Sequence, residues 1–150
     1  MEASTIINQA RTWLDTPYVH QGRVKGVGVD CIGLVNGIAL ELDLYENTSW
    51  DYTRFRELSK IHKAYRRVPQ GTALYQCLKS YAPEYPPNQM QPSDILLVSF
   101  KGKPRHTAIL TDRGTVIHAY AEANRCVENS IDFWRSSIVG TFRFREVFDG

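Results

Sequence analysis

The 150-residue sequence is poor in the features that mark several specialised classes of protein. It has three cysteines, Cys31, Cys77 and Cys126, an odd number without a CxxC pair. This pattern argues against a disulfide framework and against a cysteine-rich zinc site. No apolar run approaches the roughly 18 residues of a membrane span. The formal net charge of +2 gives no strong basic field. We therefore expect neither membrane insertion nor a nucleic-acid partner.

The beginning of the chain also lacks the pattern of an export signal. Its first residues, MEASTIINQARTWL, contain no basic region followed by an apolar one. We therefore expect synthesis in the cytoplasm without a signal peptide, with any export by another route. With 43% apolar and 23% charged residues and no internal repeat, the chain is expected to form a single domain over residues 1–150.

Hydrophobic periodicity divides the chain into a helical half followed by a strand half. The helices predicted from apolar spacing span 3–14, 31–42, 52–66 and 71–80. After a predicted loop over 82–92, the period changes to two. The five short strands that this period predicts span 94–100, 105–111, 115–120, 125–131 and 141–147. Helices followed by antiparallel strands indicate an α+β fold.

The stretch GVDCIGLVNGI, residues 28–38, places Cys31 at the start of a predicted helix. Asp30 is a favourable N-cap residue, so Cys31 falls in the first turn, where free N–H groups and the helix dipole favour a thiolate. The charge of Asp30 opposes this unless backbone N–H groups bind its carboxylate. The alternative is a small buried cysteine with a structural role.

Two histidines are expected to lie close together on neighbouring strands. His106 stands in RHTAIL and His118 in VIHAYA, and the connection DRG suits a three-residue hairpin loop with Gly114 in a left-handed conformation. If Thr111 and Thr115 close this loop, both histidines lie on one face as diagonal neighbours. A two-residue loop would place them on opposite faces.

Cys31, His106 and His118 suit the roles of nucleophile, base and orienting residue. We expect Cys31 to attack a carbonyl carbon and His106 to pair with the thiolate and then protonate the leaving amine. His118 would hold the His106 ring, and the Cys31 N–H would donate to the oxyanion. The alternatives are a structural histidine pair in the core and a metal site at the two histidines. We expect no metal and no cofactor.

The segments TPYVHQGRVKGVGVDCIGLV, RHTAIL and VIHAYAEANRCVENSI resemble the three sequence blocks of the NlpC-type cysteine peptidases of bacterial cell walls. The resemblance extends over about residues 10–145. It implies a papain-like fold in which N-terminal helices pack on a central antiparallel sheet of about five strands. It also implies that Cys31 is the nucleophile, His106 the base and His118 the third catalytic residue.

The same resemblance implies a substrate-binding role for two further residues. Tyr18 and Asp30 would hold the free amino end of a peptidoglycan stem peptide. His20, in the loop before the nucleophile, is a further candidate for lining the site, with a solvated loop histidine as the alternative. The chain departs from many members at Ile32, where they have serine, and at residues 19–22, where they have Trp-Gly-Gly after the tyrosine.

The segments PYVHQG and DCIGL look most like the phage-tail and gene-transfer-agent branch of this family. The resemblance implies a cysteine peptidase that cuts stem peptides between D-glutamate and a diamino acid. It would act at the cell wall as part of a virion tail or tail-like particle, with other tail or baseplate proteins as partners. Two other functions stay open. One is another acyl-transfer enzyme on this scaffold, such as an amidase or transpeptidase, and the other is a structural tail-tip protein.

Overall fold

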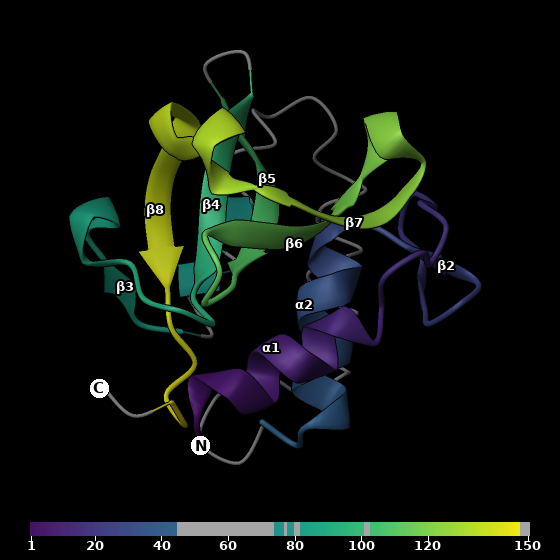
Figure 1. Ribbon diagram of the computed structural model, residues 1–150, viewed down its shortest axis with the longest axis horizontal. Helices are drawn as coiled ribbons and strands as arrows, with labels where there is room; N and C mark the ends of the chain where they lie inside the picture. Colours follow the sequence, from purple (N-terminus) through teal and green to yellow (C-terminus); the bar gives the residue numbers. More distant parts are fainter. Residues whose placement is uncertain (45–73, 77, 80–81, 101–102, 148–150) are drawn as a thin grey trace.

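The computed structural model describes residues 1–44, 74–76, 78–79, 82–100 and 103–147. The helices, strands and 3-10 turns in chain order are α1 Ala3–Arg11, β1 Arg23–Val24, β2 Gly28–Val29, α2 Cys31–Glu41, β3 Glu84–Tyr85, η1 Pro87–Gln89, β4 Ile95–Phe100, β5 Lys103–Leu110, β6 Thr115–Tyr120, η2 Ala121–Ala123, β7 Arg125–Ser130, η3 Ile131–Phe133, η4 Arg135–Ser137 and β8 Ile138–Phe142 (Figure 1). The helix predicted over 52–66 lies outside the described residues. Of the helix predicted over 71–80, residues 74–76 and 78–79 are described and helical.

The described strands form a central sheet in the order β3-β8-β4-β5-β6-β7, and every neighbouring pair is antiparallel. A small separate hairpin, β1–β2, lies just before α2 in the chain. The predicted α+β architecture with a central antiparallel sheet is confirmed. In the described part of the chain, no helix is long and apolar enough to cross a bilayer.

The sheet differs from the sequence prediction at one edge, where β3 pairs with β8 through Glu84↔Phe142 and Tyr85↔Thr141. The segment containing β3 was predicted to be a loop, because two paired residues among prolines leave no alternation to detect. The last strand, β8, spans Ile138–Phe142, whereas the prediction placed it over 141–147, so the two ranges share only residues 141–142. Phe144 and Val147 are buried in the core without being in a strand, and this burial continued the apparent alternation.

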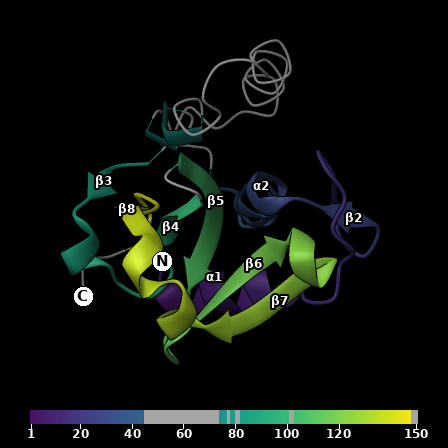
Figure 2. The same cartoon turned by 90° about the horizontal axis from the view of Figure 1, so that it is seen from above.

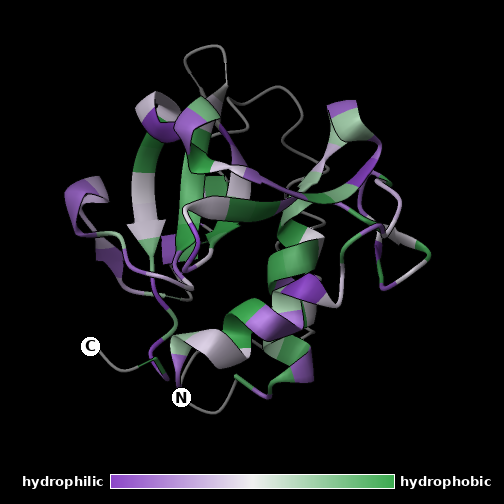
Figure 3. Ribbon diagram, in the orientation of Figure 1, coloured by the Kyte–Doolittle hydropathy of each residue, from purple (hydrophilic) through white to green (hydrophobic). Residues whose placement is uncertain are grey.

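Both faces of the sheet are buried. On one face, Ile109 and Ile117 belong to a core shared with α1 and α2, and Figure 3 shows that α2 is apolar around most of its surface. Gly37 of α2 is required there, because any Cβ would overlap the indole ring of Trp13. On the other face, Ala108 and Leu110 pack in a second cluster that includes Trp134. His106 precedes Ala108 by two residues and therefore shares this second face.

The strands that carry the two histidines pair close to their hairpin loop, at Ile109↔Ile117 and Leu110↔Val116. Helix α2 packs against both β5 and β6. Figure 2 shows α2 nearly end-on in the angle between these two strands. This arrangement brings the helix that begins at Cys31 beside the hairpin.

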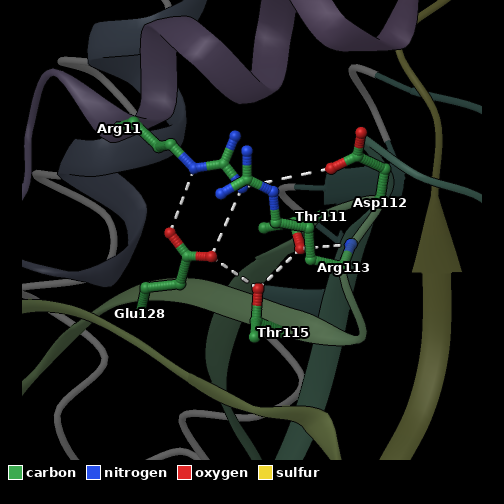
Figure 4. A network of polar contacts seen from close by, with 6 residues as sticks. All are labelled: Arg11, Thr111, Asp112, Arg113, Thr115 and Glu128. Carbon is green, nitrogen blue, oxygen red and sulfur yellow. Dashed lines mark hydrogen bonds and ion pairs between the residues drawn. The ribbon is translucent and has the colours of Figure 1, made fainter.

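A polar network attaches the hairpin loop to α1 (Figure 4). Arg11 of α1 binds Glu128 of β7 through Nε–Oε1 at 3.1 Å and Nη2–Oε2 at 3.3 Å, and it approaches Asp112 to 4.0 Å. The Thr115 hydroxyl donates to Glu128 Oε2 at 2.7 Å and lies 2.6 Å from the Thr111 hydroxyl. This network joins α1 to the β5–β6 hairpin loop and to β7.

Candidate active site

Cys31 is the first residue of α2, and Asp30 caps the helix as predicted. The Gly33 N–H donates to Asp30 Oδ1 at 2.7 Å, and the Gln21 N–H donates to Oδ2 at 2.8 Å. Both carboxylate oxygens of Asp30 therefore accept backbone hydrogen bonds. The loop from Gln21 to β2 is held against the helix start by the same contacts.

Cys31 lies against β5 at Thr107, the neighbour of His106 in the chain. The Thr107 hydroxyl donates to the Cys31 carbonyl oxygen at 3.1 Å. Burial and the charge of Asp30 raise the pKa of the Cys31 thiol to about 11, although hydrogen bonds from the backbone and side chain of Thr107 and the backbone of Ile32 lower it. Thr107, which no sequence motif predicted as a site residue, thus contacts the nucleophile candidate.

The predicted hairpin register is confirmed. The Thr111 N–H donates to the Thr115 carbonyl oxygen at 2.9 Å, and Gly114 has a φ of 68°. As a result His106 and His118 share one face, with 2.7 Å between His106 Nε2 and His118 Nδ1. A hydrogen bond therefore connects the two rings directly.

Asn129 of β7 extends this chain of hydrogen bonds. Its Oδ1 lies 2.7 Å from His118 Nε2. The β6–β7 register pairs His118 with Val127, so Asn129 is a diagonal neighbour on the same face. The sequence did not predict this contact, because the 3-10 turn η2 joins the two strands and sets a β6–β7 register that residue spacing alone does not give.

Aromatic side chains enclose the histidine pair. The Trp134 ring centroid lies 5.2 Å from His118 and 6.0 Å from His106, and the Tyr120 ring lies 5.0 Å from His118 and 6.1 Å from His106. Trp134 is itself almost fully buried. Its indole shields the two imidazole rings from water.

Burial determines the ionisation of this site. It lowers the pKa of His106 to about 3, with a further contribution from the neighbouring charge of His118. Burial also lowers the pKa of His118, and the hydrogen bond with Asn129 partly offsets this. A thiol and a neutral imidazole are therefore favoured in the resting site. The thiolate–imidazolium pair expected from the helix N-terminus is disfavoured, because desolvation penalises both charges.

The structure places Tyr18 close to the nucleophile candidate. Burial and the charges of Cys31 and Asp30 raise the pKa of Tyr18 to about 12. The Tyr18 backbone N–H donates to the Asn124 carbonyl oxygen at 2.9 Å, which fixes the segment beside β7. His20 is exposed in the turn that follows. The substrate-binding roles of Tyr18, Asp30 and His20 stay predictions.

Within the described ranges, no three or more His, Cys, Asp or Glu side chains form a group that could hold a metal ion. The groups described above are a thiol, two imidazoles and a carboxamide. These groups suit nucleophilic attack and proton transfer.

The structure thus defines an α+β protein with a cysteine at a helix start, packed on an antiparallel sheet whose hairpin carries two linked histidines. The NlpC/P60 family model matches residues 15–143, and the chain belongs to the NlpC/P60 family. Members of this family are cysteine peptidases and peptidoglycan hydrolases. No curated protein matches the chain significantly.

Solved structures of the same fold are similar to the chain at low sequence identity. The NlpC/p60 domain of the peptidoglycan hydrolase SagA is 20% identical with a TM-score of 0.64, over 95% of this chain and 99% of that domain. An NlpC/P60 family protein from Bacillus cereus ATCC 10987 is 18% identical with a TM-score of 0.65, over 96% of this chain and 40% of its own. The resuscitation promoting factor interacting protein RipA, mutated at H432, is 15% identical with a TM-score of 0.60. The match covers 95% of this chain and 61% of the RipA chain. The chain thus spans all of the SagA domain but less than two thirds of the other two proteins.

Proposed function

We propose that this protein is a cysteine peptidase that hydrolyses an amide bond in the stem peptides of peptidoglycan. One observation carries the proposal. Cys31 begins α2, which packs against β5 and β6, and these two strands carry His106 and His118, whose rings are hydrogen-bonded at 2.7 Å. Membership of the NlpC/P60 family, and the similarity to the domain of the peptidoglycan hydrolase SagA, support the substrate class.

The proposed reaction begins from the neutral pair. As the Cys31 sulfur attacks the carbonyl carbon, its proton passes to His106, which then protonates the leaving amine. The backbone N–H of Cys31, in the first turn of α2, donates to the oxyanion. Water then attacks the thioester with His106 as general base, which restores the thiol. His118 holds the His106 ring throughout.

Tyr18 and Asp30 are proposed to bind the free amino end of the stem peptide, and the bond cleaved is proposed to join D-glutamate to a diamino acid. The carboxylate of Asp30 already accepts two backbone hydrogen bonds. Each of its oxygens has a second lone pair for an ammonium group. His20 is exposed in the adjoining loop, where it can contact the remainder of the substrate.

We also propose that the protein acts as part of a phage tail or tail-like particle at the cell wall, with tail or baseplate proteins as partners. The segments PYVHQG and DCIGL support this setting. Particles that carry Cys31→Ala should assemble normally but lose efficiency at intact cell walls. Normal infection by such particles would instead favour a purely structural role.

The test of the reaction is digestion of purified sacculi and of soluble muropeptides, with the product masses measured for each. We expect cleavage of one amide bond, complete loss in Cys31→Ala, and inhibition by a thiol alkylator but not by a chelator. Cleavage that survives Cys31→Ala would overturn the proposal. Amine adducts in place of hydrolysis products, formed when an amine is added, would identify a transpeptidase.

A further inference from the structure

We propose that Asn129 is a positioning residue that selects the tautomers of both histidines, and so makes Nδ1 of His106 the basic nitrogen. This inference rests on the proposed function, in which His106 accepts the proton of Cys31. Asn129 is distinct from the three proposed catalytic residues, Cys31, His106 and His118. The direction of two consecutive hydrogen bonds, Asn129–His118 and His118–His106, decides the tautomer of each ring.

Each neutral imidazole carries one N–H and one unprotonated nitrogen. The hydrogen bonds from Asn129 to His118 and from His118 to His106 are both 2.7 Å long, so each needs one donor and one acceptor. Burial keeps both rings neutral, since it lowers the pKa of each. The chain of bonds can therefore point in only two directions.

In the first direction, Asn129 Oδ1 accepts from Nε2–H of His118. Nδ1 of His118 is then an acceptor and takes a hydrogen bond from Nε2–H of His106. Nδ1 of His106 is left unprotonated, and it can receive the proton of a thiol. In the structure, Oδ1 of Asn129 lies 2.7 Å from His118 Nε2, so the hydrogen bonds follow this first direction.

In the opposite direction, the amide nitrogen of Asn129 would donate to His118 Nε2. His118 would then donate from Nδ1 to His106 Nε2, and the proton of His106 would be on Nδ1. That ring could no longer accept a proton from Cys31 at Nδ1. The acceptor character of residue 129 thus decides whether His106 acts as a base.

Asn129 is suited to this role because it connects a buried ring with the surface. His118 is fully buried, whereas Asn129 is exposed at the end of β7. A water molecule in place of the amide could either donate to His118 or accept from it. It would therefore not fix the tautomers of the two histidines. Exposure also means that substitutions at position 129 should leave the fold intact.

The first experiment compares variants that differ in hydrogen-bonding character at this exposed position. Asn129→Asp keeps an acceptor, and we expect kcat on muropeptides within about threefold of the wild type. Asn129→Ala admits water and should lower kcat about ten- to hundredfold with little change in KM, below the roughly 10⁴-fold loss seen when a triad orienter imposes the wrong tautomer. Asn129→Lys offers only donors and should lower kcat further. Arg125→Ala, an exposed change on the same strand, is the control and should leave kcat unchanged.

The second experiment measures the tautomers directly by ¹⁵N NMR of the imidazole rings in the full chain. We expect Nε2–H on both histidines in the wild type and in Asn129→Asp. In Asn129→Lys we expect the proton of His106 on Nδ1. A proton on Nδ1 of wild-type His106, or equal kcat in the Asp and Lys variants, would overturn the inference. The NMR result does not depend on the substrate. Failure of the proposed hydrolysis is therefore distinguishable from failure of the tautomer assignment.

Discussion

Cys31 receives two opposing electrostatic influences. Its place in the first turn of α2 exposes it to the positive end of the helix dipole, which favours the thiolate. Burial and the nearby Asp30 carboxylate favour the thiol, and they prevail, since the pKa is raised to about 11. At the residue scale, desolvation therefore outweighs a partial charge from one helix terminus.

This balance predicts how Cys31 reacts with iodoacetamide. Because only the thiolate reacts, the alkylation rate should rise about tenfold per pH unit from pH 7 to 10. Mass-spectrometric peptide mapping measures the rate at each cysteine. Cys126 is fully buried, with its pKa raised to about 12, and serves as the internal control that stays unmodified. A rate at Cys31 that is constant from pH 5 to 9 would instead establish the ion pair.

Thr107 is expected to support the nucleophile through its hydroxyl. Thr107→Val removes the hydrogen bond to the Cys31 carbonyl oxygen and one of the interactions that lower the thiol pKa. We expect a loss of about 1 kcal/mol in the free energy of unfolding, measured with denaturant, and slower alkylation of Cys31 at pH 8. Thr107→Ser retains the hydroxyl and should reverse most of both effects. Unchanged alkylation in the valine variant would contradict this role.

Side-chain hydrogen bonds and ion pairs join the helices and strands that carry the candidate site. Lys25 of the β1–β2 connection binds Glu41 at the end of α2, and Glu41 also accepts from the Trp13 indole. Arg11 and Glu128 hold the histidine hairpin on α1 (Figure 4). Each pair connects separate segments of the chain, so each restrains the position of Cys31 relative to the histidine pair.

The Arg11–Glu128 pair should contribute measurably to stability. Both side chains are about one-fifth exposed, and the pair is bidentate with Thr115 as a further donor. We expect Glu128→Gln to lower the free energy of unfolding by about 1 kcal/mol in thermal or denaturant unfolding. Asp132→Asn removes a much more exposed ion pair with Arg135 and should have no measurable effect. Equal effects of the two substitutions would contradict the importance of the network.

For the whole molecule, the buried histidines predict sensitivity to acid. The pKa of His106 is lowered from 6.5 to about 3 in the folded state, so between these pH values the unfolded chain binds more protons. Stability should therefore be fully present above about pH 6.5 and should decline as the pH falls towards 3, by on the order of 2 kcal/mol between pH 7 and 5. His118 shifts in the same direction.

Denaturant unfolding at pH 7, 6 and 5 measures this dependence. His106→Gln should be less stable at pH 7 but should show a shallower loss on acidification, because the group that takes up the proton is gone. His20→Gln, at an exposed position, should retain the wild-type slope. Identical slopes in the wild type and His106→Gln would show that His106 is not the group responsible.

The local sequence alone determined the start of α2 and the register of the β5–β6 hairpin. An N-cap aspartate before an apolar run places Cys31 at the start of α2. The DRG loop sets the β5–β6 register, and with it the shared face of His106 and His118. These outcomes depend on residues a few positions apart, so backbone geometry alone is enough to derive them.

Only the tertiary structure decided what surrounds those residues. Asn129 reaches His118 across the β6–β7 register, and Trp134 covers both rings from the segment after β7. Thr107 meets Cys31 because α2 packs against β5. These contacts join segments distant in the chain, and they set the burial that makes the thiol and the imidazoles neutral. Desolvation depends on every neighbouring atom, so the spacing of residues in the sequence does not contain it.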